Sequence, residues 1–480
     1  MPLNLSNRDQ NSGHLFYNRR LRAAITRFSV RMKHDDRKQQ AALVLGVVFV
    51  LIGIGWMALL HIMKPAGLTG DSDIVGDRRT GAVYARIDGR LHPALNLTSA
   101  RLATGTAGVP TWVGAAEIAR HPTGPLIGIP GAPEDLAVTG GTSAWTVCDT
   151  APARANATPL VTAIAGALDP AGPAPPLPAG RAVLGVHDGQ TLLIWNGRRA
   201  RIDPADRTLR FNLGLDPGRT RAVPISNALY DALPPSEPIT VPVVPGAGDP
   251  SRWLPGTPIG TVLTTRDAAG AGSGFYLLLG AGVQQISGFV ADLLRTAGPE
   301  AAALQPISPD RLVGIPEVES LAVDDYPDGP VQFVDTDANP VTCLSWEKHG
   351  ADRQAAIGVR SGRGLPVPAG QDARLVRLVR DDRAPDSVEA DRTLVLPGAA
   401  NLVATTSELP ATETRESLYW ISPQGVRFGI EWDDQTLSAL GVDAAAAVQA
   451  PWPLIRVFAP GPAIGRDAAL REHDALPGGG

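Results

Sequence analysis

Glycine and lysine residues are the first candidates for chemistry, because a nucleotide site would need them in a fixed pattern. A P-loop reads G-x-x-x-x-G-K-[ST]: its glycines free backbone N–H groups for the phosphates, and its lysine reaches the β- and γ-phosphates. After residue 64 the sole lysine is Lys348, whose surroundings, Trp-Glu-Lys-His-Gly, do not fit. The glycine-rich stretch at 270–274, GAGSG, opens a strand-like run, so no helix N-terminus would face a phosphate. We therefore expect no nucleotide site and no cofactor.

Histidines and carboxylates give no stronger signal. Neither G-x-S-x-G nor H-E-x-x-H occurs, and no two histidines are spaced i, i+4; they lie at positions 14, 34, 61, 92, 121, 187, 349 and 473. His92, which precedes a proline, is expected in a turn. The acidic pairs at 324–325 and 433–434 are interpreted as helix caps or solvated turns, with a two-carboxylate site as the alternative. We expect no catalytic residue and no metal ligand.

A long apolar run identifies the element that holds the chain at a membrane. Residues 41–63, AALVLGVVFVLIGIGWMALLHIM, contain no Asp, Glu, Lys or Arg. A helix of this length crosses a hydrocarbon core of roughly 30 Å. The alternative is a cleaved signal peptide, but its apolar core would be about 7–15 residues long and would end at a small-residue cleavage site. We predict one transmembrane helix over 41–63.

The charge distribution sets the orientation. Residues 1–40 carry a net charge of +6, and because the whole chain carries −5 and residue 64 adds one positive charge, residues 65–480 carry −12. The positive-inside rule then places the N-terminus in the cytoplasm and the large body on the extracytoplasmic side of the membrane. A body of −12 also disfavours nucleic-acid binding.

The two cysteines, Cys148 and Cys343, would lie in an oxidising compartment, where one intramolecular bond can form between them. We predict that disulfide. The alternative is a pair of buried free thiols, which behave as small apolar residues.

The cytoplasmic segment 1–40 has a helical pattern of its own. Leu21, Ile25, Phe28 and Met32 recur at helical spacing among arginines. Such a helix lies on anionic headgroups or docks onto a partner protein, and the pattern alone favours neither.

The body after residue 64 contains a fourfold repeat of a hydrophobic strand, a tight turn, a second strand and a helix-like segment. The strand–turn–strand parts lie at 81–93, 191–203, 275–286 and 418–430. Asp88-Gly89 and Asn196-Gly197 are hairpin turn pairs, and Gly282 and Gly425 occupy the same place in the other copies. Copies one and three share one kind of tail and copies two and four another, which predicts a quasi-two-fold arrangement. Chance similarity between glycine-turn hairpins is the alternative.

We therefore predict a mixed fold, mainly β with short helices: an elongated body of four hairpin–helix repeats around a central β module. The expected parts are a cytoplasmic segment (1–40), the membrane helix (41–63), repeat 1 (64–149), a Pro/Ala-rich linker (150–181), repeat 2 (182–258), repeat 3 (259–346), the central β module (347–410), and repeat 4 with the C-terminal tail (411–480).

Several long strings resemble the EccB family, a membrane component of mycobacterial type VII (ESX) secretion systems. The strings are GAVYARIDGRLHPALNLTSARLATG, GPLIGIPGAP, SAWTVCDT, TCLSWEK, SLYWISPQGVRFGI and the N-terminal SNRDQNSGHLFYNRRLRAAITRFSVRMKHDDRKQ, which is most like the paralogue of the second ESX system. The resemblance implies an oligomeric complex with EccC, EccD and EccE and an associated mycosin protease. It also brings the label ATPase, for which the residues give no motif.

The sequence leaves two main hypotheses for the function, from different classes, and a third that is less favoured. The first is a structural, membrane-anchored subunit that scaffolds the extracytoplasmic side of a secretion complex. The second is an ATPase, with ATP as the ligand that the family label implies. The third is a cell-wall-binding module that uses Trp112, Trp253 or Trp452 in shallow grooves.

Overall fold

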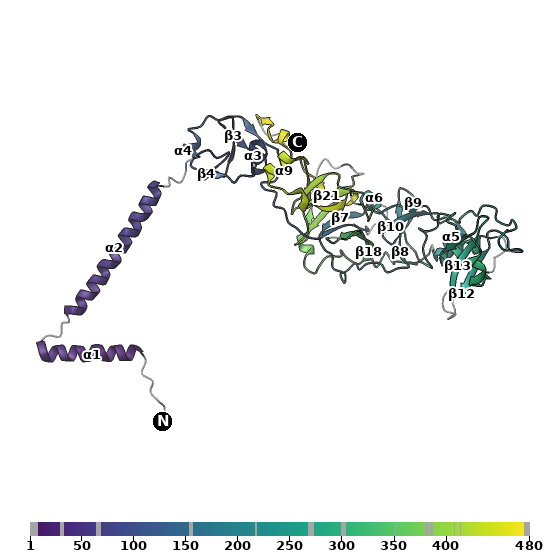
Figure 1. Ribbon diagram of the computed structural model, residues 1–480, viewed down its shortest axis with the longest axis horizontal. Coiled ribbons are helices and arrows are strands. Elements are labelled where there is room, and N and C mark those ends of the chain that lie inside the picture. Colours follow the sequence, from purple (N-terminus) through teal and green to yellow (C-terminus); the bar gives the residue numbers. More distant parts are fainter. Residues whose placement is uncertain are drawn as a thin grey trace, which may run out of the picture. The chain divides into compact units, whose positions relative to one another are not determined.

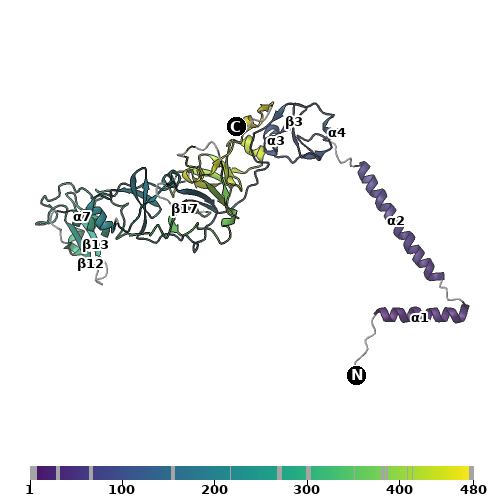
Figure 2. The same cartoon turned by 180° about the vertical axis from the view of Figure 1, so that it is seen from behind.

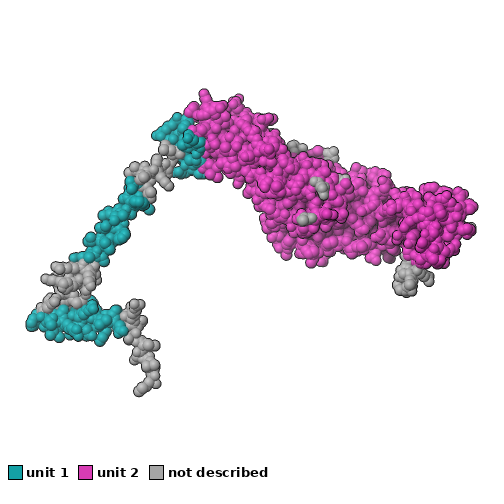
Figure 3. Space-filling view, in the orientation of Figure 1, with its two compact units in different colours: residues 1–72, 76–81, 111–121 teal, residues 73–75, 82–110, 122–480 magenta. Residues whose placement is uncertain are grey.

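The computed structural model describes residues 8–28, 33–63, 69–152, 157–216, 218–266, 273–298, 304–350, 352–379, 384, 387–407, 409–412 and 414–474. The chain divides into two compact units, which Figure 3 colours teal and magenta. Unit 1 comprises Met1–Ser72, Gly76–Gly81 and Thr111–His121, and unit 2 comprises Asp73–Val75, Ala82–Pro110 and Pro122–Gly480.

Unit 1 contains the two long N-terminal helices, α1 (Arg8–Arg27) and α2 (Lys33–Met63) (Figure 1). The stretch Gln40–Leu59 of α2 has a mean hydropathy of 2.6 and is not buried by the rest of the chain. Among the described residues it is the one helix long and apolar enough to cross a membrane. The helix begins before the predicted residue 41 because the polar sequence KHDDRKQQ contains no Gly or Pro to end it.

The helix α1 ends earlier than its apolar spacing suggests. Leu21 and Ile25 lie on α1, but the helix stops at Arg27 and Phe28 has a φ of 52°. A left-handed residue cannot continue a right-handed helix, so Phe28 does not share the α1 face. Met32 lies outside the described residues.

The rest of unit 1 is a small packed turn. Strand β4 (Thr111–Val113) and helix α4 (Ala115–Ile118) lie beside the segment 76–81, where Arg78 N–H donates to the carbonyl of Val113 at 3.0 Å. Asp77 accepts from Arg79 N–H and the Thr80 hydroxyl, both at 2.9 Å, and these bonds lower the pKa of Asp77. Strand β1 (Ile74–Asp77) begins in unit 2 and ends here.

Unit 2 contains four antiparallel hairpins, each followed by a helix. They are β2 (Val83–Ile87), β3 (Arg90–Ala94) and α3 (Leu97–Thr104); β9 (Gln190–Trp195), β10 (Arg198–Ile202) and α5 (Arg207–Leu213); β13 (Ser273–Leu278), β14 (Val283–Ile286) and α7 (Gly288–Ala297); and β22 (Leu418–Ile421), β23 (Val426–Ile430) and α9 (Asp434–Leu440).

The turns of these hairpins follow two different rules. In the first two, Asp88-Gly89 and Asn196-Gly197 take positive φ at both residues, as type I′ turns require. Gly425 also has a positive φ, of 78°. Gly282 does not belong with it: it is not among the positive-φ glycines, and a side chain there would collide with the carbonyl oxygen of Pro316. Close backbone approach, not turn geometry, therefore requires glycine at 282.

Side chains cap all four helices. Asn96, Asp206, Ser287 and Asp433 each accept a hydrogen bond from a backbone N–H in the first turn. The cap of α9 is Asp433, the first member of the acidic pair 433–434 that the sequence predicts as a helix cap or a solvated turn.

The hairpin–helix segments share cores in pairs. Leu102 of α3 packs in one cluster with Leu437 and Leu440 of α9. Leu209 of α5 packs in another cluster with Val290 of α7. Figures 1 and 2 show α3 and the C-terminal strands at one end of unit 2 and β12, β13 and α7 at the other. The first segment thus packs with the fourth, and the second with the third.

Further strands extend each hairpin into a sheet. β5 (Leu126–Ile127) and β26 (Glu472–His473) extend the first; β8 (Arg181–His187), β11 (Val223–Pro224) and β16 (Gln332–Phe333) the second; β12 (Val262–Arg266) and β15 (Gln305–Pro306) the third; β21 (Leu402–Thr406), β24 (Val448–Pro451) and β25 (Ala459–Pro460) the fourth. Short helices complete the unit: α6 (Asn227–Ala232), α8 (Pro309–Val313), α10 (Trp452–Ile455), α11 (Arg466–Ala469), and two 3-10 turns, η1 (Asp372–Arg374) and η2 (Ala444–Ala446).

The central six-stranded sheet has the order β18-β17-β6-β7-β20-β19. Its strands are β18 (Ala356–Gly362), β17 (Val341–Lys348), β6 (Ser143–Thr150), β7 (Leu160–Ala165), β20 (Arg392–Val395) and β19 (Val376–Arg377). Three of these strands lie wholly or mostly outside the predicted central β module (347–410). β6 comes from the predicted repeat 1, β7 from the predicted linker, and β17 mostly from the predicted repeat 3. Strands that are far apart in the sequence can pair in one sheet. The central module therefore does not correspond to one continuous segment of the sequence.

Candidate functional site

The two sides of the central sheet differ in chemistry because neighbouring residues of a strand point to opposite faces. Cys148 of β6 lies directly opposite Cys343 of β17, and Trp145 lies opposite Trp346. We call the side that carries the cysteines the cysteine face and the other side the tryptophan face. Each has its own hydrophobic cluster.

A disulfide joins Cys148 and Cys343 on the cysteine face. Both residues are fully buried, and Ile164, Val341 and Leu394 pack around them. The bond links adjacent strands across a sequence separation of 195 residues. It therefore holds together two parts of the sheet that are remote along the chain.

The tryptophan face is the larger core. Trp145 is 1% exposed and meets Phe458 edge-on, with ring centroids 5.9 Å apart. The same cluster contains Trp346, Leu229 of helix α6 and Ile455 of helix α10.

Asp149 is a buried carboxyl on the tryptophan face, next in sequence to Cys148. It accepts from the backbone N–H and the hydroxyl of Ser226, both at 2.7 Å. Burial, together with the nearby charge of Asp391, raises the pKa of Asp149 to about 7 although the Ser226 hydrogen bonds act in the opposite direction. Asp149 therefore changes its charge near neutral pH.

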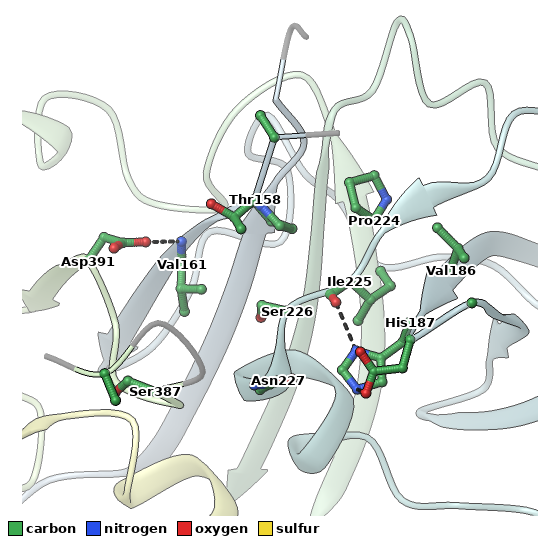
Figure 4. Close-up of a pocket in the computed structure, with 15 residues that line it drawn as sticks. Thr158, Val161, Val186, His187, Pro224, Ile225, Ser226, Asn227, Ser387 and Asp391 are labelled. Carbon is green, nitrogen blue, oxygen red and sulfur yellow. Dashed lines mark hydrogen bonds and ion pairs between the residues drawn. The ribbon is translucent and has the colours of Figure 1, made fainter. Parts of the chain in front are cut away.

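Ser226 also lines a cavity of about 610 Å³, shown in Figure 4. His187, at the end of β8, is held there by a 3.0 Å contact from Nδ1 to the carbonyl oxygen of Ile225 and by stacking on Tyr230 at 4.0 Å. Asp391 accepts from the N–H of Val161 at 2.7 Å on the opposite wall. The lining thus combines acidic and hydroxyl groups with one imidazole.

This arrangement is not that of a nucleophilic triad. The carbonyl of Ile225 requires the proton of His187 on Nδ1, and Nε2 lies 3.6 Å from the exposed Asp188. Among the described residues no hydrogen bond joins His187 to Ser226 or to Asp149. The geometry that would activate the Ser226 hydroxyl is absent from these residues, and Asp149 positions the start of α6 instead.

The residues tested for nucleotide chemistry lie in structural positions. Lys348 ends β17, and its Nζ donates to Gln449 Oε1 at 2.7 Å. In the stretch 270–274 the described residues 273–274 open strand β13; the first three lie outside the described residues. Within the described chain no group of three His, Cys, Asp or Glu side chains is placed to hold a metal ion.

The acidic pairs divide between an ion pair and a cap. Asp325 forms an ion pair with Arg198. Asp433 accepts from the N–H groups of Gln435 and Thr436 at 3.0 and 2.9 Å, and these bonds lower its pKa.

His92 and the three tryptophans lie on packed elements. His92 lies on β3, opposite Ala85 of β2, so it is a strand residue and not a turn residue. Trp112 covers Gly76, and Trp253 Nε1 donates to the carbonyl of Gly280 at 3.3 Å. Trp452 stacks on Tyr419 with centroids 5.4 Å apart.

The apolar side chains of α1 are open to solvent. Leu21 is 42% exposed, Ile25 71% and Phe28 98%. Leu15 and Phe16, on other sides of the helix, are also exposed. No described residue of the chain covers the helix, so its apolar side chains are available to a membrane or a partner.

Sequence reasoning missed the Asp149–Ser226 contact and the His187 cavity. The available signal was Asp149 itself, a charged residue within the apolar run of strand β6. Its partner lies 77 residues away, and only the pairing of β8 with β11 brings that segment to the sheet.

Comparison with known proteins places the whole chain in one group. The family model described as "Type VII secretion system ESX-1, transport TM domain B" matches residues 3–478. The chain is 61% identical to the ESX-2 secretion system ATPase EccB2 of Mycobacterium tuberculosis strain H37Rv, over 99% of this chain and 97% of the relative. It is 39% identical to the ESX-5 secretion system ATPase EccB5 of Mycobacterium marinum, over 99% and 95%.

Solved structures agree with this grouping. A chain of the intact ESX-5 inner membrane complex matches with a TM-score of 0.75 and 38% identity, over 99% of this chain and 97% of that one. A chain of the EccB3 dimer from the ESX-3 core complex matches with a TM-score of 0.71 and 34% identity, over 83% and 100%.

Proposed function

The chain belongs to the EccB family of type VII secretion components and is 61% identical to the paralogue of the second ESX system; we propose on this premise that its body scaffolds the extracytoplasmic side of a secretion complex. It is a membrane-anchored structural subunit of the kind found in ESX inner membrane complexes. The observation that supports a scaffold is the long-range construction of the central sheet. The central sheet is built from segments 195 residues apart and locked by a disulfide, as a load-transmitting framework would be.

The name ATPase, which the relatives carry, finds no counterpart in the described residues. Lys348 is engaged with Gln449, and Ser273 and Gly274, the described part of the glycine-rich stretch, open strand β13. We therefore place the contribution of this chain in assembly.

The proposed orientation has a cytoplasmic N-terminus and an extracytoplasmic body. The supporting observation is the contrast between the +6 segment before the membrane helix and the −12 body after it. Reporters fused at residue 5 and after Gly480 test this directly. The first should be active only in the cytoplasm and the second only outside, and the opposite pattern would end the assignment.

We propose that α1 docks onto partner subunits through Leu21 and Ile25. Burying two such side chains is worth on the order of several kcal/mol. The double replacement Leu21→Ser/Ile25→Ser should leave α2 inserted and release the partners from a tagged chain. Leu15→Ser/Phe16→Ser is the matched control on other sides of α1. Complexes of normal size in the first variant would show that α1 only lies on the lipid surface.

We further propose that the predicted parts are four repeats related by a quasi-two-fold axis through the central sheet. Two observations support this. The first segment packs with the fourth and the second with the third, which is the pairing that an axis exchanging one with three and two with four requires. Cys148 and Cys343 lie opposite one another. Limited proteolysis tests the arrangement: the body should resist cleavage until the disulfide is reduced, and equal resistance in both states would oppose it.

The partners proposed by family resemblance are EccC, EccD, EccE and a mycosin protease. The solved relatives are parts of oligomeric membrane complexes, which supports assembly with other subunits. A cell-wall-binding role would require free aromatic faces. Trp452 stacks on Tyr419 and the Arg252 guanidinium lies over the Trp253 ring, whereas Trp112 is 43% exposed. Sedimentation of the body with peptidoglycan would favour that third function if it occurred.

A further inference from the structure

A small folded part of unit 1 follows the membrane helix closely in the chain. We call it the proximal turn, and it contains β4 and α4 (Figure 1). Its residues are 69–72, 76–81 and 111–121. Two contacts fix its first residues: Thr69 Oγ1 lies 2.9 Å from His121 Nε2, and Ser72 Oγ lies 2.7 Å from Thr111 Oγ1. The proximal turn is therefore folded from its first described residue onward.

The length of the chain keeps the proximal turn near the membrane that α2 crosses. Helix α2 ends at Met63 and the described part of the turn begins at Thr69, so six peptide units join them. At no more than about 3.6 Å per residue, Thr69 lies within roughly 22 Å of the end of the helix. The headgroup layer adds about 5–7 Å on each side of the hydrocarbon core. The turn is therefore tethered within reach of the lipid headgroups.

Trp112 of β4 gives the proximal turn an exposed amphipathic ring. A side chain at Gly76 would collide with the six-membered ring of Trp112, so this part of the indole packs over the Gly76 backbone. Trp112 is nevertheless 43% exposed, and its Nε1 donates a hydrogen bond to no described residue. Tryptophan is enriched at membrane–water interfaces because its ring is apolar and its N–H is polar. Trp112 has the exposure and the free donor that suit this environment.

Two exposed arginines adjoin Trp112. Arg78 Nη2 donates to the carbonyl oxygen of Trp112 at 2.8 Å, which places the guanidinium group of Arg78 beside this residue. Arg79 follows in sequence, and neither arginine forms an ion pair with a described residue. Guanidinium groups bind phosphate oxygens through paired, charge-assisted hydrogen bonds. The two arginines therefore supply phosphate ligands next to the exposed indole.

The charge of the proximal turn differs from that of the rest of the body. Its three arginines balance its three carboxylates, so the net charge of −12 lies outside the turn. Asp77 accepts from the Arg79 N–H and the Thr80 hydroxyl, and Glu117 pairs with Arg120 at 2.7 Å, whereas Asp71 is exposed. An anionic membrane surface therefore repels the turn less than it repels the rest of the body.

We propose that the proximal turn rests on the phospholipid surface of the membrane that α2 crosses, with Trp112 at the level of the headgroups and Arg78 and Arg79 on lipid phosphates. A weak contact suffices, because the short linker gives the turn a high effective concentration at that surface. The contact requires that α2 crosses the membrane, but it depends neither on the side that the body occupies nor on partner subunits. It gives the body a second attachment to the membrane and restricts its motion about the end of α2.

Quenching of tryptophan fluorescence in vesicles tests the contact. The purified full chain is reconstituted into vesicles of phosphatidylglycerol and phosphatidylcholine whose acyl chains carry bromine near the carbonyl end. Trp56 of α2 should be quenched in the parent, which verifies insertion of the helix separately. In Trp56→Phe some quenching should remain, and the further change Trp112→Phe should abolish it. The matched control is Trp432→Phe in the same background: Trp432 is 40% exposed, and its loss should leave the quenching intact.

A second variant keeps the test decisive if Trp112→Phe disturbs the turn. Arg79→Gln leaves the bond from Arg78 to Trp112 in place and, in the Trp56→Phe background, should lower the ratio of bound to free turn by about fivefold. Arg219→Gln, at a side chain that is 90% exposed, is the control and should leave this ratio unchanged.

Three results in the vesicles would overturn the proposal: no quenching in Trp56→Phe, equal quenching after the loss of Trp112 and of Trp432, or equal ratios in Arg79→Gln and Arg219→Gln. A fourth would replace the lipid by the cell wall as the ligand of this surface. In that case Trp112→Phe would abolish sedimentation of the body with peptidoglycan and leave the quenching in Trp56→Phe unchanged.

Discussion

The two faces of the central sheet are stabilised in different ways. On the tryptophan face, Trp145 and Trp346 pack beneath α6 and α10 in a broad core. On the cysteine face the core is small, and a disulfide lies at its centre. The comparison indicates that the covalent bond compensates for apolar area that the cysteine face lacks.

The faces also separate opposite charges. Asp149 and Asp391 lie on the tryptophan face, whereas Arg392 and Arg360 lie on the cysteine face, although Asp391 and Arg392 are neighbours in sequence. Burial lowers the pKa of Arg360, which donates to the carbonyls of Asp169 and Ala174 at 3.4 Å. A one-residue slip in register would exchange the two sets, so the pattern also enforces correct pairing.

Removing the disulfide should produce the largest loss. Cys148→Ser opens a link between residues 195 apart, and the chain-entropy relation gives roughly 5 kcal/mol as an upper figure. Thermal unfolding should show a lowered Tm in Cys148→Ser that Cys343→Ser does not lower further in the double variant. The native, unreduced chain should contain no free thiol. Full maleimide labelling of both cysteines under denaturing, non-reducing conditions would contradict this.

Truncating the aromatic core of the other face comes next. Trp145→Ala should cost about 3–5 kcal/mol, because a fully buried ring leaves a cavity that the sheet cannot close. Urea unfolding measures the loss. Trp432, 40% exposed, supplies the control: Trp432→Ala should cost well under half as much. Similar losses in the two variants would mean that the tryptophan face is not the main core.

A pH effect on stability should follow from Asp149. Its pKa is raised to about 7 in the folded chain, above an unfolded value of 3.8, so the folded state holds the proton more tightly. The resulting stabilisation is complete below about pH 4 and is lost as pH rises to about 7, by up to about 4 kcal/mol. Asp149→Asn, which stays neutral, should flatten that part of the stability–pH curve. An unchanged slope between pH 4 and 7 would contradict the assignment.

The smallest effect concerns a helix cap away from both faces. Asp433→Ala removes the acceptor for Gln435 and Thr436 N–H and should cost about 1 kcal/mol. Asp434→Ala, one residue along, should cost less because its side chain is not the cap. Chemical denaturation measures the free energy of unfolding of both variants. Equal losses in the two would contradict the assignment of Asp433 as the cap.

The sequence predicts local structure well where a side chain acts on its own neighbourhood. The hairpin turns at Asp88-Gly89 and Asn196-Gly197, the helix cap at the acidic pair 433–434 and the apolar stretch of α2 all follow from short-range rules. The Cys148–Cys343 pairing follows from there being only two cysteines.

What the sequence does not predict depends on long-range pairing. The strand β7 lies in a stretch rich in Ala and Pro, and its place between β6 and β20 is fixed by partners more than two hundred residues apart. The Asp149–Ser226 contact arises in the same way. Gly282 is read as a turn glycine because the approach of Pro316 cannot be seen from spacing.

The central claim, a membrane-anchored structural subunit of a secretion complex, is tested most directly by purifying the tagged full chain from membranes in mild detergent. Its size and its companions are then measured by native electrophoresis and mass spectrometry. The account predicts an assembly much larger than the single chain, containing EccC, EccD and EccE, that is retained when Lys348 is replaced by Ala. A single chain free of other components, or an assembly that Lys348→Ala dissolves, would contradict it.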